Sequence, residues 1–405
     1  MGIISSLRSV ARFKKPTFSL ASRRLARAAN VMDLRDIASR RLPGGIFDYI
    51  DGGAEDERTM RENSAAFGRW TFVPRVLRDV SRIDISTDIL GERLPAPIIF
   101  SPTGFTRIPH SQGELAVARV AARHGLPYSL STMSTRSIEE VAAVNPGTKW
   151  FQVYVWRDRD MVRDMLMRAD AHGFSAIQIT VDTAILGRRE RDVRRGFTLP
   201  PELGLATIAS GLRHPAWTWD FVRAEPITFS NVERYAGDRR RTAVNLSMFI
   251  ASQFDPTLSW NDVAWFRENW PGRIILKGIQ SAEDARLAAD HGVDAIMVSN
   301  HGGRQLDRAP APIDIVAPVR DAVGPDMCVI LDGGVRRGSD IVTAVALGAN
   351  AVTMGRTYLW GLGAAGERGV EAALGMLTSE MRRSMALAGL RNLAEIDRSV
   401  VRRAD

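Results

Sequence analysis

The sequence of 405 residues has a single cysteine, Cys328, which rules out an internal disulfide framework and a metal site built from several thiolates. Lysine is nearly absent as well, with four lysines against 50 arginines. No run of about 18 uncharged apolar residues occurs, so we expect no transmembrane helix. The six histidines show no metal-ligand spacing, and we predict no metal. The apolar and charged fractions, 45% and 25%, exclude a disordered, collagen-like or coiled-coil chain.

Acidic residues are missing from the first 30 positions, which carry seven of the eight net positive charges. The remaining chain is nearly neutral, so a basic surface for nucleic acid is not expected. This basic N-terminal extension suits contact with an anionic membrane, a transit-like segment or, through Gly2, myristoylation; a solvated tail is the simplest alternative. We expect a cytoplasmic protein, with peripheral contact at the inner face of the cell membrane as an option. The basic residues are Arg8, Arg12, Lys14, Lys15, Arg23, Arg24 and Arg27.

Eight short, continuously apolar runs predict strands that are buried on both faces, as in a parallel sheet. They are Ala96–Ser101, Pro127–Ser131, Trp150–Val155, Ala176–Val181, Arg273–Lys277, Ala295–Ser299, Val329–Asp332 and Ala351–Met354. Helical spacing of apolar residues occurs between them, at Glu114–Arg123, Ser137–Val144, Arg159–His172, Ser281–His291 and Ser339–Leu347. Ser137 with Glu140, and Ser281 with Asp284, resemble capping boxes. Gly125, Gly173, Gly292 and Gly348 each follow a helix, as C-terminal caps do.

This repeated strand–helix alternation predicts an α/β fold, a (β/α)8 TIM barrel, with a doubly wound open sheet as the alternative. We expect the basic extension at 1–30 and one domain at 31–405, with its barrel at about 96–375. Residues 31–95 predict a mostly helical N-terminal cap. A long insertion after strand 4, at about 195–259, falls on the face where barrel active sites lie, and a lid, a membrane-docking loop or a subunit contact are its candidate roles.

Each predicted strand delivers polar groups to the same rim, because parallel strands of a barrel end on one face. Strands 7 and 8 end in glycines and arginines that offer bare backbone N–H groups and two guanidinium groups, which predicts a phosphate site. Ordinary turns are the alternative there. This candidate phosphate site comprises Asp332, Gly333, Gly334, Arg336, Gly355 and Arg356.

His301, after strand 6, is the best candidate for a general base, and Asp182, after strand 4, could orient it. Arg189 and Arg304 could together grip a carboxylate. Lys277 has two readings, neutralising an anionic cofactor or forming a Schiff base with a carbonyl. A structural histidine, surface arginines and a structural salt bridge are the respective alternatives.

Taken together, these strand ends resemble the FMN-dependent 2-hydroxy-acid oxidase and dehydrogenase family, which includes glycolate oxidase, mandelate dehydrogenase and the flavin domain of flavocytochrome b2. The likeness covers roughly residues 31–400. Ser-Asn-His-Gly-Gly-Arg-Gln-Leu-Asp at 299–307 is the most specific motif; Asp-Gly-Gly-Val-Arg-Arg-Gly at 332–338 and Phe-Asp-Tyr…Gly-Gly-Ala-Glu-Asp at 47–56 support it. The basic extension and Pro-Thr-Gly-Phe-Thr-Arg at 102–107 look most like actinobacterial L-lactate dehydrogenases.

The resemblance implies roles for the rim residues. His301 would be the base, paired with Asp182, and Tyr154 would bond to the substrate oxygen that is oxidised. Lys277 would stabilise negative charge on the reduced flavin. Substrate would contact Tyr49, Met133, Tyr154, Arg189 and Arg304. FMN would contact Pro102, Thr103, Gly104, Ser131, Gln152, Thr180, Lys277, Ser299, Asp332, Gly333, Gly334, Arg336, Gly355 and Arg356.

Three positions depart from the pattern of relatives. Ala184 stands where many have Pro, and Met133 stands where glycolate oxidase has Trp, which leaves room for a methyl group or a longer substituent. Gly104 stands where several oxidases have Ala, which argues against oxygen as the main acceptor. The resemblance therefore implies oxidation of an L-2-hydroxy acid, above all L-lactate to pyruvate, with electrons passed to a quinone or another carrier, in a homotetramer.

Other functions stay open on the sequence alone. They are an oxygen-using oxidase, a mandelate or longer-chain hydroxy-acid dehydrogenase, a Schiff-base aldolase using Lys277, and a non-catalytic module that binds a phosphate ligand or a membrane surface.

Overall fold

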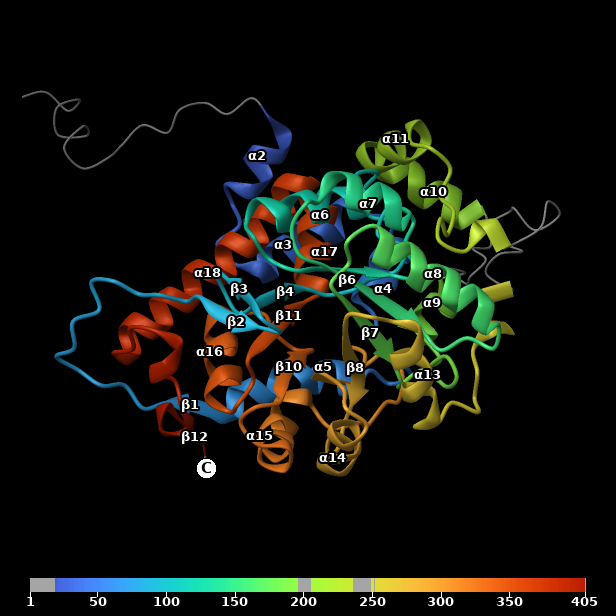
Figure 1. The fold of residues 1–405 in the computed structure, drawn as a ribbon. Helices are drawn as coiled ribbons and strands as arrows, with labels where there is room; N and C mark the ends of the chain where they lie inside the picture. The colour runs from blue at the N-terminus through green and yellow to red at the C-terminus, as the bar shows by residue number, and fades with distance from the viewer. Residues whose placement is uncertain (1–18, 196–204, 236–248, 251, 405) are drawn as a thin grey trace, which may run out of the picture.

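Eight parallel strands close into a barrel in the order β10-β11-β4-β5-β6-β7-β8-β9 (Figure 1). The computed structural model describes residues 19–195, 205–235, 249–250 and 252–404. The barrel confirms the eight predicted strands and rules out the open sheet. The strands are β4 (Ile98–Phe100), β5 (Tyr128–Ser131), β6 (Lys149–Tyr154), β7 (Ala176–Thr180), β8 (Arg273–Ile279), β9 (Ala295–Ser299), β10 (Cys328–Asp332) and β11 (Ala351–Met354).

Strand β8 runs two residues beyond its predicted end, to Ile279. A bulge between Lys277 and Ile279 shifts its register with β9. Gly278 has a φ of +111°, and a Cβ there would lie 2.8 Å from the Cβ of Asp182. The glycine therefore lets the Asp182 loop approach β8 closely, next to Lys277.

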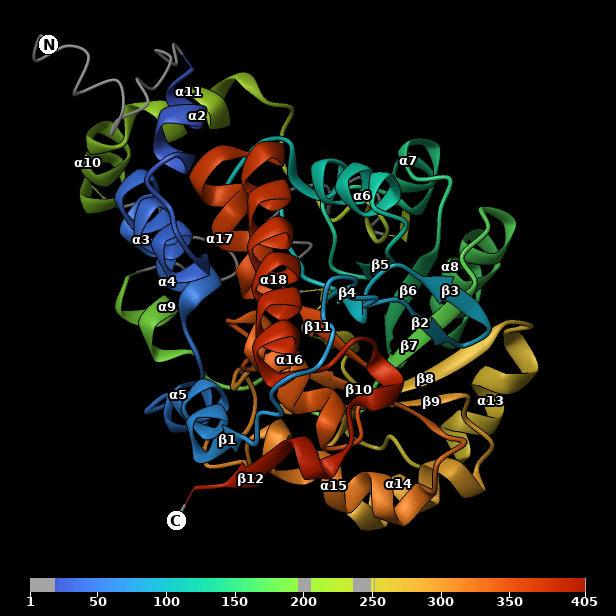
Figure 2. The ribbon, with the colours of Figure 1, turned by 90° about the vertical axis from the view of Figure 1, so that its left-hand side faces the viewer.

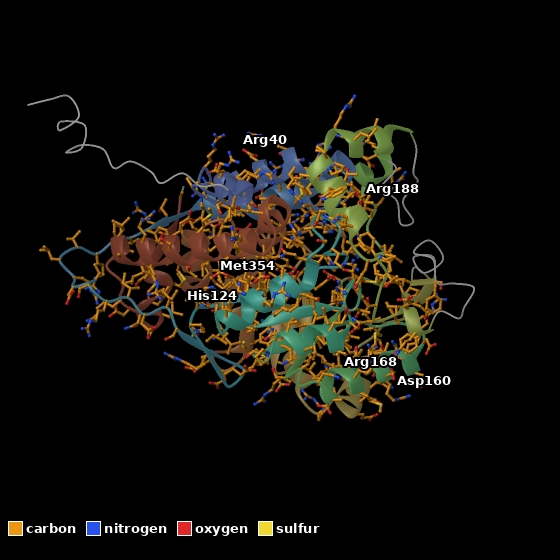
Figure 3. All side chains as sticks on the ribbon, turned by 90° about the horizontal axis from the view of Figure 1, so that it is seen from above. Arg40, His124, Asp160, Arg168, Arg188 and Met354 are labelled. Carbon is orange, nitrogen blue, oxygen red and sulfur yellow. The ribbon has the colours of Figure 1, made fainter. Side chains whose placement is uncertain are left out.

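The five predicted helices are confirmed as α6 (Gly113–Arg123), α7 (Ile138–Val144), α8 (Arg159–Ala171), α14 (Ala282–Asp290) and α16 (Gly338–Ala346). Ser137 and Glu140 form a reciprocal capping box. Ser281 accepts the N–H of Asp284, but the Asp284 carboxylate bonds to the Ser281 hydroxyl instead of returning to the backbone. The four predicted C-terminal glycines all have positive φ. Figure 3 shows Met354, at the end of β11, in the interior, and Asp160, on α8, at the periphery.

Helices α17 (Arg356–Ala365) and α18 (Glu367–Ala388) lie side by side against the barrel (Figure 2). They approach closely at Gly361 and Gly369: a Cβ on Gly361 would lie 2.3 Å from the carbonyl oxygen of Gly369. This contact holds the N-terminus of α17, which begins at Arg356, at the end of β11. Between β9 and β10 lies α15 (Pro312–Val323).

The N-terminal cap at 31–95 is less helical than predicted. Its helices end at Arg69, and strands and loops follow up to residue 95. Its helices are α3 (Val31–Arg41), α4 (Gly44–Asp51), α5 (Arg58–Ala65) and the 3-10 turn η1 (Ala66–Arg69), and a further helix, α2 (Leu20–Leu25), lies in the basic extension. A hairpin of β2 (Thr87–Ile89) and β3 (Glu92–Leu94) follows, and Ile89 and Leu94 pack against Trp150 in the lower core of the barrel. Strand β1 (Trp70–Phe72) pairs with the C-terminal β12 (Val401–Arg403).

Between β7 and β8 the chain forms α9 (Glu190–Arg194), α10 (Leu205–Arg213), α11 (Pro215–Arg223), the 3-10 turn η2 (Glu233–Tyr235) and α13 (Asn261–Asn269). Helix α11 is tied to the loop after β4. The Asp220 carboxylate accepts the N–H and hydroxyl of Ser111, and Trp217 donates to the carbonyl of Ile108. Gly2 and the basic residues up to Lys15 lie outside the described residues. Among the helices that the structure describes, none is long and apolar enough to cross a bilayer.

Candidate active site

A cavity of about 230 Å³ opens at the carboxyl ends of the barrel strands. Most predicted site residues line it: Tyr49, Pro102, Thr103, Gly104, Ser131, Met133, Tyr154, Arg189, Lys277, His301, Arg304, Asp332, Gly333, Gly334, Arg336, Gly355 and Arg356. Four others, Gln152, Thr180, Asp182 and Ser299, lie directly behind the lining and bond to it or to one another. The structure thus brings all the predicted residues together at one end of the barrel.

His301 and Asp182 form a pair at the wall of the cavity. Nδ1 of His301 lies 3.1 Å from Oδ1 of Asp182, so the carboxylate holds the proton on Nδ1 and leaves Nε2 as the basic nitrogen. Burial lowers the pKa of His301 from its ordinary value of 6.5, although the negative charge of Asp182 acts to raise it. The imidazole is therefore neutral at neutral pH and able to accept a proton.

Lys277 is buried at the floor of the cavity. Its Nζ donates to Oδ2 of Asp332 at 2.8 Å and to Oγ of Ser299 at 2.9 Å. Burial would lower the pKa of Lys277, but the charges of Asp332 and Asp182 outweigh burial and raise it. The ammonium group therefore stays charged at neutral pH, which disfavours the Schiff-base reading, since that reaction needs a neutral amine.

Asp332 is the centre of this network. Its Oδ1 accepts hydrogen bonds from Ser101 and Thr353, and its Oδ2 accepts one from Ser299. Burial opposes its charge, but Lys277 and these hydroxyl groups hold its pKa well below the usual range. The carboxylate therefore joins the ends of four strands, β4, β9, β10 and β11, beneath the cavity.

Arg304 and Arg189 both line the cavity, and both lie against the ring of Tyr49. The centre of each guanidinium lies over the Tyr49 ring, at 5.2 Å for Arg304 and 6.0 Å for Arg189. Arg304 also donates to the carbonyls of Tyr49 and Gly52. Burial and the charge of Arg189 lower the pKa of Arg304 to about 9, so it remains a cation at neutral pH. The pair can bind a carboxylate of a small molecule.

Arg336 and Arg356 provide the buried positive charge of the predicted phosphate site. Burial lowers the pKa of each to about 10, and their hydrogen bonds go to backbone carbonyls, of Val335 for Arg336 and of Gly302 and Gly52 for Arg356. Within the part of the chain that the structure describes, neither has a carboxylate at ion-pair distance, and Nε of Arg356 is buried without a partner. Arg356 begins α17, and Arg336 lies in the loop between β10 and α16; two buried cations that line one cavity fit the dianionic phosphate of FMN.

The remaining predicted residues support the lining from behind. Gln152 accepts from the hydroxyl of Ser131 and donates to that of Thr180, which links the ends of β5, β6 and β7. Thr103 bonds to the hydroxyl of Tyr358. Gly104 leaves no room for a methyl group, because a Cβ there would lie 2.9 Å from the Cβ of Met133.

Several lining residues are absent from the sequence-based prediction. Phe229, Ile250 and Phe254 come from the chain between β7 and β8 and form an apolar wall, with Phe254 against the ring of Tyr154. Their positions follow from how this segment folds over the rim, and no motif marks them. Thr353 could have been found, because it is a polar residue inside an apolar strand.

The comparisons with known proteins agree with this geometry. The family model for FMN-dependent dehydrogenases matches residues 38–403. A Mycobacterium tuberculosis protein, whose assigned activity of L-lactate dehydrogenase is provisional, is 43% identical over 97% of this chain and 94% of its own length. Glycolate oxidase of Spinacia oleracea is 44% identical over 91% of this chain and 94% of its own.

Among solved structures, the monotopic membrane protein (S)-mandelate dehydrogenase superposes with a TM-score of 0.90. It is 37% identical and covers 93% of this chain and 100% of its own. Sequence motifs, barrel and site therefore lead to one conclusion. The chain belongs to the FMN-dependent 2-hydroxy-acid oxidase and dehydrogenase family, whose members bind FMN and oxidise 2-hydroxy acids.

Proposed function

We propose that this enzyme oxidises L-lactate to pyruvate and passes the electrons to a quinone or another carrier. The observation that carries the proposal is that His301, paired with Asp182, lines the same cavity as two arginines able to bind a carboxylate. The apolar wall, together with the lining residues Met133 and Leu186, favours a substrate with an apolar substituent over glycolate. The provisional assignment of the M. tuberculosis relative supports L-lactate.

Arg304 and Arg189 bind the substrate carboxylate, and Tyr49 fixes the two guanidinium groups over its ring. The hydroxyl of Tyr154 donates to the substrate oxygen. Burial raises the pKa of Tyr154, so this hydroxyl keeps its proton at all relevant pH values. These contacts would orient the substrate with its reacting carbon toward Nε2 of His301.

Oxidation of a 2-hydroxy acid removes two electrons and two protons. FMN, when bound, would accept both electrons and one of the two protons, and would thereby gain one negative charge. Nε2 of His301 takes one proton, and Asp182 stabilises the imidazolium ion that results. Lys277 places a positive charge at the floor of the cavity, where it balances the negative charge that reduction brings.

The other site residues hold the cofactor. Gly334, Arg336, Gly355 and Arg356 would hold the phosphate of FMN, and Asp332 would accept hydrogen bonds from its ribityl hydroxyl groups. The ring system would contact Pro102, Thr103, Gly104, Ser131, Gln152 and Thr180. A Cβ on Gly334 would lie 1.9 Å from the carbonyl oxygen of Asn63, so only glycine lets α5 close over this turn.

We also propose peripheral contact with an anionic membrane. Leu212, Trp219 and Val222 on α10 and α11 are 74%, 64% and 71% exposed. Helix α2, which carries Arg23 and Arg24, lies at the same end of the molecule in both ribbon views (Figures 1 and 2). Exposed apolar groups beside basic ones are typical of proteins that bind to membrane surfaces, and the structurally similar mandelate dehydrogenase is a monotopic membrane protein.

Anaerobic titration with L-lactate tests the proposed reaction. We expect stoichiometric L-lactate to bleach the visible flavin band, because two electrons per substrate reduce the cofactor completely. Reoxidation should be fast with a soluble quinone and slow with oxygen. A band that persists with lactate but bleaches with mandelate or glycolate would contradict the substrate, and rapid formation of peroxide would contradict the acceptor.

The pH dependence of kcat/KM tests the base. Since His301 must be neutral to take a proton and its pKa is lowered, kcat/KM should be constant at neutral pH and fall on acidification below pH 6.5. Replacing Asp182 by Asn removes a charge that raises this pKa, so the acid limb should move to lower pH and kcat should drop.

His301→Asn should lower kcat by about 10²- to 10⁴-fold while flavin stays bound, because asparagine tolerates the left-handed backbone at this position but cannot act as the base.

His172→Gln changes an exposed histidine at the C-terminal end of α8; it is the matched control and should leave the profile unchanged. An acid limb that stays in place in Asp182→Asn would show that another group controls it.

Substitution of two neighbouring arginines, one in the proposed phosphate site and one outside it, tests that site through the affinity for FMN. Arg336→Met should weaken FMN binding by the apoprotein by about 10- to 100-fold, because a charge-assisted contact to the phosphate is lost. Arg337→Met removes an exposed cation that pairs with Glu380 instead, and should leave the dissociation constant unchanged. Quenching of FMN fluorescence measures both constants, and equal constants would refute the assignment.

Sedimentation with vesicles tests membrane contact. We expect binding to vesicles of phosphatidylcholine with phosphatidylserine, weaker binding to phosphatidylcholine alone, and loss of binding in the double variant Trp219→Ser, Val222→Ser. Met167→Ser changes a comparably exposed residue on α8 and serves as the control. Equal recovery of all three proteins with the vesicles would rule out this surface.

A further inference from the structure

A third charged residue lies behind the two arginines at the substrate end of the cavity. Asp192, on the short helix α9, is only 8% exposed, and its Oδ2 lies 3.9 Å from Nη1 of Arg189. Its charge also raises the pKa of Arg304 against the larger effects of burial and of Arg189. Asp192 does not line the cavity itself, so a bound substrate would meet the two guanidinium groups and not this carboxylate.

The next residue along the chain fixes α9 in place. Arg191 pairs with Asp48 at 3.6 Å, with Asp51 at 3.3 Å and with Glu57. These acids flank the C-terminal end of α4, the helix that also supplies Tyr49. Helix α9 is therefore held against the element that positions both guanidinium groups, and Asp192 occupies a fixed position relative to them.

Asp192 differs from these three acids, which pair with Arg191. Its carboxylate lies next to Arg189 instead. Burial raises the pKa of Asp192, and the negative charges of Asp48 and Glu57 raise it further. The positive charges of Arg304 and Arg189 act in the opposite direction. Burying a carboxylate near two other acids is unfavourable unless its charge compensates a cation. The cations that it faces are the two that bind the substrate.

We propose that Asp192 is a specificity-determining residue that leaves the Arg189–Arg304 pair with one uncompensated positive charge and so selects 2-hydroxy acids with a single carboxylate over those with two. This inference rests on the proposed function, which assigns the pair to the substrate carboxylate. L-Lactate brings one negative charge and balances the site. L-Malate, which carries a second carboxylate in place of a methyl hydrogen, brings one charge too many into a buried, weakly screened cavity.

Removal of the Asp192 charge should therefore favour dianions over monoanions. In Asp192→Asn, affinity for both kinds of ligand should increase, but the dianion should gain more, since it carries twice the charge. We expect the ratio of dianion to monoanion affinity to rise by about 10- to 100-fold, as a unit charge a few ångströms away would produce at an intermediate dielectric constant. A purely structural role would weaken both ligands together and leave the ratio unchanged.

The experiment compares the holoenzyme with Asp192→Asn, Asp192→Glu and Glu190→Gln. Propionate and succinate, inert analogues of L-lactate and L-malate without the hydroxyl group, are titrated and followed by perturbation of the flavin absorption band. The kcat/KM ratio for L-malate over L-lactate is measured in parallel. Both ratios should rise in Asp192→Asn, and Asp192→Glu should stay close to the unmodified enzyme because it retains the charge. Glu190→Gln removes a charge from the same helix and should not change them, because among the described residues Glu190 forms its ion pair with Arg194, away from the two substrate arginines.

The outcomes separate this inference from the proposed function. A parallel loss of affinity for propionate and succinate in Asp192→Asn would overturn it and leave Asp192 as a support for Arg189. If neither hydroxy acid reduces the flavin, the proposed reaction fails, but the binding ratio still decides the role of Asp192. If the unmodified enzyme binds neither analogue, both the assignment of the arginines and this inference are wrong.

Discussion

Buried positive charge is the constraint on which the rest of this site depends. Lys277, Arg189, Arg304, Arg336 and Arg356 all line one cavity at the end of the barrel. Some of this charge is balanced permanently by carboxylates of the protein, above all by Asp332 beneath Lys277. In the proposed function the rest is balanced by ligands, namely a dianionic phosphate and the carboxylate of the substrate. The division between permanent and ligand-borne counter-charge determines what the cavity can bind.

Helix α4 links the two ends of the cavity. The carbonyl oxygen of Gly52, at its C-terminus, accepts hydrogen bonds from both Arg304 and Arg356. These arginines follow different strands and serve different ligands in the proposed function, yet they share one acceptor at the negative end of a helix. A displacement of α4 would therefore disturb substrate and phosphate contacts together. The N-terminal cap is thus part of the active site, although it lies outside the barrel.

The sequence predicts what depends on local pattern and on barrel topology. The strands are recognisable because they are continuously apolar, and polar residues at their ends converge because parallel strands end on one face. Helix α15 has no such signal, since Pro318 interrupts its pattern. The wall residue Phe254 and the acid Asp192 are placed by the path of the long segment between β7 and β8. Their positions depend on tertiary contacts such as the pairing of Arg191 with Asp51, which no short-range spacing encodes.

His301 has a φ of +59°, in the left-handed region, and Gly302 and Gly303 continue in that region. Such a backbone is unfavourable for a residue with a side chain, and surrounding contacts must maintain it. Glycine at position 301 would relieve that strain and remove the base at the same time. At this position, then, conformational stability and catalysis impose opposing demands. The left-handed histidine thus costs the fold some backbone stability, and the proposed role of its imidazole as the base accounts for that cost.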